Sequence, residues 1–129
     1  MAQCYKIKVV TDFAAAHHLR DYPGECSRTH GHNWKIEIEV NTSSLDHLGM
    51  AVDFKQVKSA AQLILKEYDH RYLNEISPFD QINPTAENIA AHLFRCLATV
   101  LNDSRTRVSC VTVWETERAC ASYYEEVPR

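Results

Sequence analysis

The stretch HGHNWKIEIEV, residues 30–40, decides the fold. From Trp34 to Val40, apolar residues alternate with charged ones, which is the pattern of a β-strand with one face in the core. His30 and His32 share the parity of Trp34. The stretch therefore predicts a strand that begins with two imidazoles on its buried face.

Residues 5–17 continue the alternation on the N-terminal side. The members of one parity are Tyr5, Ile7, Val9, Phe13, Ala15 and His17. A loop with the turn formers Asp21, Pro23 and Gly24 separates this segment from the next strand, and the two are expected to pair as a hairpin. His17 then lies on the same face as the two later histidines, unless a bulge shifts the alternation.

Two helices are predicted after the hairpin. Asp53 is expected to cap the first, whose apolar stripe consists of Phe54, Val57, Ala61, Ile64, Leu65 and Tyr68. Thr85 is expected to cap the second, with a stripe of Ile89, Leu93, Leu97 and Val100. Residues 69–84 are polar and contain Pro78 and Pro84, so they are predicted to be loop.

Strand patterns return at residues 107–116 and 119–126, which completes a ββααββ order. We expect an α+β fold in a single domain, residues 1–129, with a four-stranded antiparallel sheet and both helices on one face. The other sheet face is expected to be apolar and to need cover. Because one short chain has nothing left to cover it, oligomerisation is predicted.

Composition excludes several classes of protein. The net charge of −3 does not favour a nucleic-acid-binding surface. No apolar run approaches the roughly 18 residues of a membrane span, and the polar N-terminus does not resemble a signal peptide. A cytoplasmic protein is expected. The five cysteines are odd in number and scattered, so a disulfide framework is not expected.

The histidines suggest a zinc site. Alternate strand residues start about 6.6 Å apart, and imidazoles can converge from there onto one ion. His17, His30 and His32 would supply three ligands, which leaves a fourth position open in a catalytic site. Cys26 lies in the loop before His30. Spacing allows it to be a fourth ligand, which would close the site, or a base beside the metal.

Two further features carry chemistry. Asp69 and His70 are adjacent, and a carboxylate beside an imidazole is a recurring general-base arrangement. Glu115 has the parity of Val111 and Val113, so its carboxylate is expected to point inward, where it needs a partner or a ligand. His18 has the opposite parity and is expected to be exposed, and His47 and His92 have no predicted partners.

These residues together resemble the 6-pyruvoyltetrahydropterin synthase and 6-carboxytetrahydropterin synthase family. The matching segments are Phe13–His17, Cys26–His32, Asp53–Phe54, Leu65–Asn74, Asn83–Asn88 and Trp114–Thr116. The resemblance implies the tunnelling fold (T-fold), in which ββααββ subunits join their sheets into a trimeric β-barrel and two trimers usually stack. It also implies active sites at subunit interfaces.

The resemblance also implies roles for the matching residues. His17, His30 and His32 correspond to the zinc ligands and Cys26 to the catalytic thiol. Asp69 and His70 resemble an acid–base pair contributed by a neighbouring subunit, and Glu115 resembles the residue that anchors the pterin. The candidates for contacts to the triphosphate are Lys6, Lys8, Arg20, Arg28 and Arg71.

The three-residue gap between Cys26 and His30 resembles the bacterial 6-carboxytetrahydropterin synthases of queuosine biosynthesis. The implied reaction converts 7,8-dihydroneopterin triphosphate and water to 6-carboxy-5,6,7,8-tetrahydropterin, acetaldehyde and triphosphate. A 6-pyruvoyltetrahydropterin synthase is the alternative within the family. A non-catalytic protein with a structural His3Cys zinc site is the alternative of another class.

Overall fold

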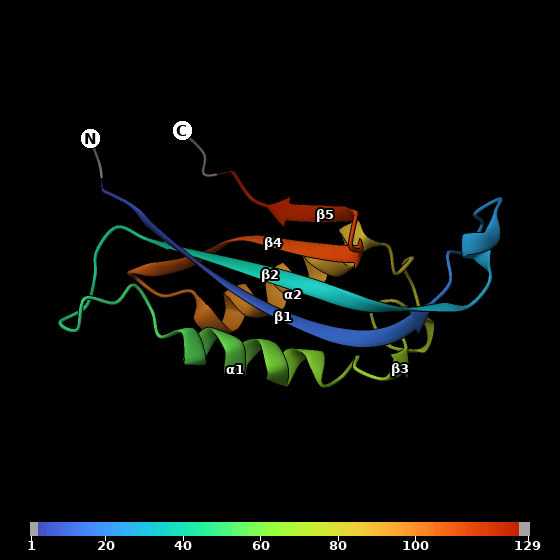
Figure 1. Ribbon diagram of the computed structural model, residues 1–129, viewed down its shortest axis with the longest axis horizontal. Helices are drawn as coiled ribbons and strands as arrows, with labels where there is room; N and C mark the ends of the chain where they lie inside the picture. The colour runs from blue at the N-terminus through green and yellow to red at the C-terminus, as the bar shows by residue number, and fades with distance from the viewer. Residues whose placement is uncertain (1–2, 127–129) are drawn as a thin grey trace.

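Two long strands form the centre of the sheet in the computed structural model, which describes residues 3–126 (Figure 1). β1 (Tyr5–His17) pairs antiparallel with β2 (His30–Thr42) along its whole length, from Tyr5 opposite Thr42 to His17 opposite His30. Because directly opposed residues share a sheet face, the register places His17, His30 and His32 on one face. The predicted hairpin is confirmed.

The remaining strands extend this hairpin on both sides. β4 (Thr106–Thr116) pairs antiparallel with β2, and β5 (Ala119–Tyr124) pairs antiparallel with β4. The helices α1 (Phe54–Leu65) and α2 (Ala86–Leu101) both lie on one face of the sheet (Figure 1). Apart from one short strand between the helices, the predicted ββααββ order is confirmed, as is the α+β class.

The strand count differs from the prediction. A two-residue strand, β3 (Arg71–Tyr72), pairs parallel with Ala15 and Ala16 of β1, so the sheet has five strands in the order β3-β1-β2-β4-β5. A short 3-10 helix, Leu73–Glu75, follows β3 directly. Both elements lie in the segment predicted to be loop. The sequence did not predict β3, because two residues are too few to show an alternating pattern.

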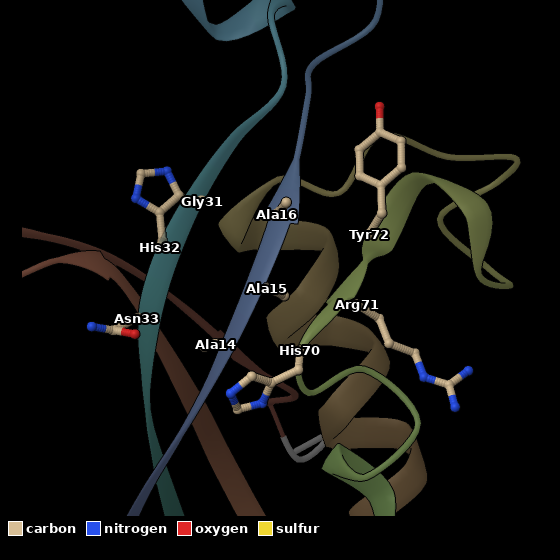
Figure 2. A pocket seen from close by; sticks show the side chains of 9 residues that line it. All are labelled: Ala14, Ala15, Ala16, Gly31, His32, Asn33, His70, Arg71 and Tyr72. Carbon is tan, nitrogen blue, oxygen red and sulfur yellow. The ribbon is translucent and has the colours of Figure 1, made fainter.

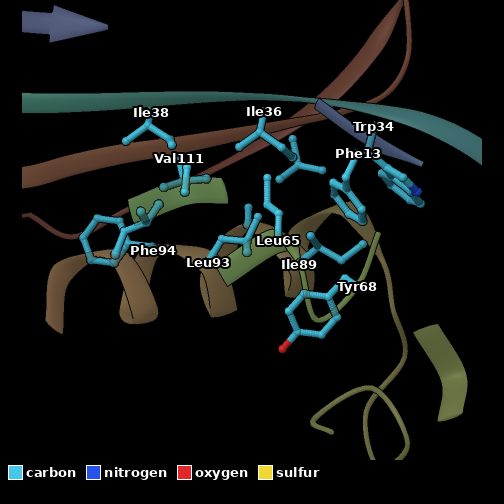
Figure 3. Packing of buried hydrophobic residues seen from close by; sticks show 14 of the residues in the cluster. Phe13, Trp34, Ile36, Ile38, Leu65, Tyr68, Ile89, Leu93, Phe94 and Val111 are labelled. Carbon is cyan, nitrogen blue, oxygen red and sulfur yellow. The ribbon is translucent and has the colours of Figure 1, made fainter. Parts of the chain in front are cut away.

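The two helix caps are as predicted. The Asp53 side chain accepts a hydrogen bond from the Lys55 N–H at 2.9 Å, and the Thr85 side chain accepts one from the Asn88 N–H at 3.1 Å. The core lies between the sheet and the helices (Figure 3). Trp34 is fully buried in it and donates its indole N–H to the Ala15 carbonyl.

Two predicted members of the helix stripes are exposed. Phe54 and Val100 are each 61% exposed, so these two predictions are wrong. In α2 the buried row runs through Leu93, Leu97 and Leu101, at intervals of four residues. Val100 lies about 100° around the helix from Leu101, outside that row. Phe54 is the first residue of α1 and borders an apolar groove beside Ile7.

The sheet face away from the helices is polar, which corrects the predicted apolar face. Lys6 pairs with Glu39 at 3.4 Å, and Lys8 pairs with Glu37 at 3.5 Å, across β1 and β2. The backbone N–H and C=O groups along the sheet edges do remain without partner strands. Within residues 3–126, β1 has no strand beside it from Tyr5 to Ala14 on the side away from β2, and β5 is the opposite edge of the sheet. Such edges are ready to pair with another chain.

Neither of the two α-helices in residues 3–126 is long and apolar enough to cross a membrane. All five cysteines are free thiols.

Candidate functional site

Three histidine rings gather where β1 ends and β2 begins. The ring centroids of His17 and His30 are 4.5 Å apart, those of His30 and His32 are 4.8 Å apart, and those of His17 and His32 are 5.2 Å apart. His17 is 1% exposed, and the other two are partly buried. The hairpin register creates this cluster, because it places His17 directly opposite His30.

Glu115 completes the cluster from β4. Its Oε1 lies 3.3 Å from Nε2 of His17 and 3.3 Å from Nε2 of His32. The β4–β5 register shifts between Trp114 and Thr116, so Glu115 sits in a bulge, which re-aims its side chain. One ligand atom from each of the four residues lies within 4.8 Å of the others. Such a set can bind a metal ion.

The hydrogen bonds around the rings favour metal binding through Nε2. The Nδ1–H of His17 donates to the Pro84 carbonyl at 2.7 Å, and the Nδ1–H of His30 donates to the Arg28 carbonyl at 2.7 Å. This tautomer leaves a lone pair on Nε2. The Nε2 atoms of His17 and His32 are buried without a hydrogen-bond partner. Because an unpaired buried polar atom is costly, these atoms fit a site that a cation completes.

The protonation state of the rings also suits a ligand role. Burial lowers the pKa of His17, although the bond to the Pro84 carbonyl opposes this effect. Burial likewise lowers the pKa of His32, against an opposing effect of Glu115. Both imidazoles are therefore neutral near pH 7, and the neutral ring is the form that binds a metal.

Cys26 does not belong to the group of four. It lies in a short 3-10 helix, Glu25–Ser27, and its thiol is partly buried. The Leu19 N–H donates to the Cys26 carbonyl at 2.7 Å, which holds the loop closed on itself. Among the described residues, Glu115 and not Cys26 is the fourth group beside the three histidines.

Asp69 and His70 do interact through their side chains. His70 Nδ1 lies 3.0 Å from Asp69 Oδ2, and the Ala14 N–H donates to Asp69 Oδ1 at 2.9 Å. His70 adopts φ of 60°, an uncommon conformation for this residue, and its own N–H donates to the Ala14 carbonyl. The Ala14 N–H, and next the contact with His70, lower the pKa of Asp69. The carboxylate therefore stays ionised and orients the ring.

An open pocket of about 460 Å³ lies across β3, β1 and β2. Figure 2 shows His32 projecting from β2 on one side of β1, with His70 and Tyr72 on the other side. The Asp69–His70 pair is exposed and lies at the edge of β1, outside the cluster formed by the three histidines and Glu115. A second molecule at this edge would meet the pair directly.

Three of the five basic residues considered as phosphate contacts have partners within the chain. Lys6 and Lys8 pair with glutamates on the polar sheet face. The Arg20 guanidinium donates to the main-chain carbonyls of Asn74, Phe79 and Ile82. Arg71 lines the pocket described above.

His92 has partners, which corrects the expectation from sequence. Its Nε2 lies 2.8 Å from the Tyr68 hydroxyl and 3.6 Å from the Cys96 thiol. Burial raises the pKa of Tyr68 to about 12 and lowers the pKa of His92. The spacing of His92 and Cys96 on one helix could have indicated their contact, but the contact with Tyr68, in the turn after α1, had no signal in the sequence.

We expect the free energy of unfolding of the metal-free protein to fall as the pH drops from about 7 to 5. Burial holds the pKa of His17, His32 and His92 below the ordinary 6.5. Between pH 7 and 5 the unfolded chain binds more protons than the folded chain. The contribution of the three buried imidazoles to the free energy of unfolding is therefore complete above about pH 6.5 and is lost as the pH falls. His92→Gln keeps a hydrogen-bond acceptor for the Tyr68 hydroxyl. It should reduce the slope of the free energy of unfolding against pH.

Urea unfolding at a series of pH values measures this slope. His47→Gln is the matched control, because His47 is exposed in a loop, and its slope should equal that of the wild type. A wild-type slope in the His92→Gln variant would contradict the assignment of His92 to this effect.

The strand order, the two helices on one face and the histidine cluster at the end of the hairpin define a T-fold protein with a candidate metal site. Comparison with known structures agrees. The 6-pyruvoyl tetrahydropterin synthase of Caenorhabditis elegans superposes with a TM-score of 0.85 at 27% identity, covering 95% of this chain and 96% of the other.

Sequence comparison then assigns the family. A family model described as 6-pyruvoyl tetrahydropterin synthase matches residues 6–126, and the chain belongs to this family. A putative 6-carboxy-5,6,7,8-tetrahydropterin synthase of Archaeoglobus fulgidus is 37% identical over 105 residues, which cover 80% of this chain and 85% of the relative. The 6-carboxy-5,6,7,8-tetrahydropterin synthase of Bacillus subtilis is 33% identical over 109 residues, covering 81% and 73%.

Proposed function

We propose that this protein is a zinc-dependent 6-carboxy-5,6,7,8-tetrahydropterin synthase. It would convert 7,8-dihydroneopterin triphosphate and water to 6-carboxytetrahydropterin, acetaldehyde and triphosphate, a step of queuosine biosynthesis. The observation that carries the proposal is the group of four potential ligand atoms within 4.8 Å, two of them buried and unpaired. The names of the archaeal and bacterial relatives support the choice of product.

In this proposal, His17, His30 and His32 hold the zinc ion through Nε2. A bound zinc ion supplies Lewis acidity toward substrate oxygens. Four protein ligands would close a tetrahedral site, whereas three leave a position open for substrate. We therefore assign Glu115 to the pterin, whose amino group and ring N–H can donate to its carboxylate. The 33% exposure of the Glu115 side chain leaves room for this role.

Cys26 and the Asp69–His70 pair are the proposed acid–base groups. The Cys26 thiolate would take a carbon-bound proton from the substrate side chain. Asp69 Oδ2 accepts from His70 Nδ1–H, which leaves His70 Nε2 free to accept and return a proton. The exposed position of the pair at the β1 edge supports a site that combines it with the cluster of a neighbouring subunit.

We propose a homo-oligomer, either a trimer or a dimer of trimers, in the cytoplasm. The unpaired edges of β1 and β5 support sheet pairing between subunits, which removes exposed backbone donors and acceptors. Pairing of these strand edges, and not burial of an apolar sheet face, would then hold the subunits together. The partner of the enzyme would be its small-molecule substrate, with no nucleic acid or membrane involved.

The second candidate is a 6-pyruvoyltetrahydropterin synthase, which the description of the family model and the Caenorhabditis elegans structure favour. Both enzymes would release triphosphate, but only the carboxy-forming reaction releases acetaldehyde. Purified protein loaded with zinc and supplied with 7,8-dihydroneopterin triphosphate should yield acetaldehyde and 6-carboxytetrahydropterin in equal amounts. Mass spectrometry of the pterin, with an acetaldehyde assay, measures both. A pyruvoyl product without acetaldehyde would select the second candidate.

A further inference from the structure

Tyr72 connects the two chain segments that carry the first two histidines of the cluster. It lies on β3, and its ring lines the pocket that His32 and His70 also border (Figure 2). Its hydroxyl is within hydrogen-bond distance of His18 Nδ1 and lies 3.2 Å from Thr29 Oγ1. These two residues are the chain neighbours of His17 and His30.

The position of these contacts is what makes them informative. The β1–β2 ladder ends at the pair His17 and His30, so His18 and Thr29 lie just beyond the last paired residues. Strand ends fray where no further ladder bonds hold them. The Tyr72 hydroxyl bridges the two segments between the last ladder pair and the Leu19 N–H bond to the Cys26 carbonyl farther along the loop.

The hydrogen atoms can be assigned consistently. Thr29 O–H can donate to the Tyr72 oxygen, and Tyr72 O–H to His18 Nδ1, so each hydroxyl has one acceptor. The same segment also holds the His18 main chain. The His18 N–H donates to Asn74 Oδ1 at 2.9 Å, and Asn74 Nδ2–H donates to the His18 carbonyl at 3.0 Å.

We propose that Tyr72 is a positioning residue for the metal site, which fastens the strand ends that carry His17 and His30. The inference rests on the metal site of the proposed function. The two rings are oriented individually by the Pro84 and Arg28 carbonyls, but those bonds do not set the distance between the strands. The bridge through Tyr72 adds a tie between the two strands next to their last ladder pair, and groups outside the ligand set tune metal affinity in this way.

The test compares Tyr72→Phe with the wild type as purified full-length proteins, stripped of metal and titrated with zinc against a competing chelator. Phenylalanine keeps the ring and removes only the hydroxyl. We expect zinc to bind about tenfold more weakly, at the low end of the usual effect of such groups, because Tyr72 acts through chain neighbours of the ligands. Tyr123→Phe is the matched control, since that hydroxyl donates to Glu125 just beyond β5, and it should bind zinc as the wild type does.

A cobalt-substituted sample gives a second reading. The visible absorption of bound Co²⁺ depends on ligand geometry, so Tyr72→Phe should change the spectrum and Tyr123→Phe should not. A purely structural role for Tyr72 would lower the melting temperature without changing the spectrum or the zinc affinity. That result would overturn the proposal.

Thr29→Val provides an independent variant, because Thr29 is exposed and its replacement leaves the core untouched. It should weaken zinc binding severalfold, and the double variant should be no weaker than Tyr72→Phe alone, since both changes break one bridge. If the losses of zinc affinity in the two single variants multiply in the double variant, the two residues do not act through one bridge, and the proposal is overturned. Wild-type protein that binds no zinc would overturn the proposed function and this inference together. Equal affinity in the wild type and Tyr72→Phe would overturn this inference alone.

Discussion

Replacing Cys26 by alanine should lower turnover by about 10²–10⁴-fold, while the purified protein keeps its full complement of zinc. The thiol is the proposed base for a carbon-bound proton, whereas the three histidines of the cluster are assigned to zinc in the same proposal. Cys26 lies outside the group of four potential ligands, so its removal should leave metal affinity unchanged. Steady-state kinetics and metal analysis of the same preparation measure the two quantities.

Cys120→Ala is the control for this experiment, because Cys120 is exposed on the last strand. Its turnover and zinc content should equal those of the wild type. If Cys26→Ala instead loses zinc and thermal stability together, Cys26 is a ligand, and the non-catalytic protein with a structural His3Cys site becomes the better description. Retained turnover with zinc bound would remove the base role of the thiol.

The second large effect is expected for His32→Ala, which should lose stoichiometric zinc and, with it, turnover. Losing a direct ligand should weaken zinc binding by more than about 100-fold, beyond the usual cost of changing a group outside the ligand set. His32 is a better target than His17, whose ring is 1% exposed and would leave a cavity in the core. The metal-free variant should melt close to the metal-free wild type, because it loses an unpaired buried Nε2.

His47→Ala controls for the general loss of an imidazole, since His47 lies exposed in the connection between β2 and α1. It should bind one zinc ion per chain with wild-type affinity. Zinc that stays bound to His32→Ala at wild-type affinity would show that His17, His30 and Glu115 form the ligand set. The open position, and with it the assignment of Glu115 to the pterin, would then need revision.

The elements that the sequence predicts well are those with a period. The strand over residues 5–17 and the helices after Asp53 and Thr85 have the predicted bounds to within a few residues, because each packs one periodic face against the core. The common face of His17, His30 and His32 follows from the same alternation. It needed only the hairpin to be regular, and the ladder runs without a bulge from Tyr5 to His17.

The site features that the sequence did not predict depend on contacts between distant segments. β3 is too short for a pattern, and Tyr72 lies 54 residues from His18 along the chain. The Pro84 carbonyl that orients His17 is a backbone atom 67 residues away, with no side-chain identity to reveal it. Glu115 reaches the imidazoles from a bulge, and parity alone could not foresee how that bulge directs its carboxylate.

The sequence by itself therefore determined three features: the alternation that forms the sheet, the face of the sheet that the helices cover, and the histidines that lie on that face. These are local properties, since each depends on residues two to four positions apart. The tertiary structure decided how the strand ends are held together, which carboxylate stands beside the imidazoles, and that the Asp69–His70 pair lies exposed at an open edge. Those arrangements arise only when the folded chain brings distant segments into contact.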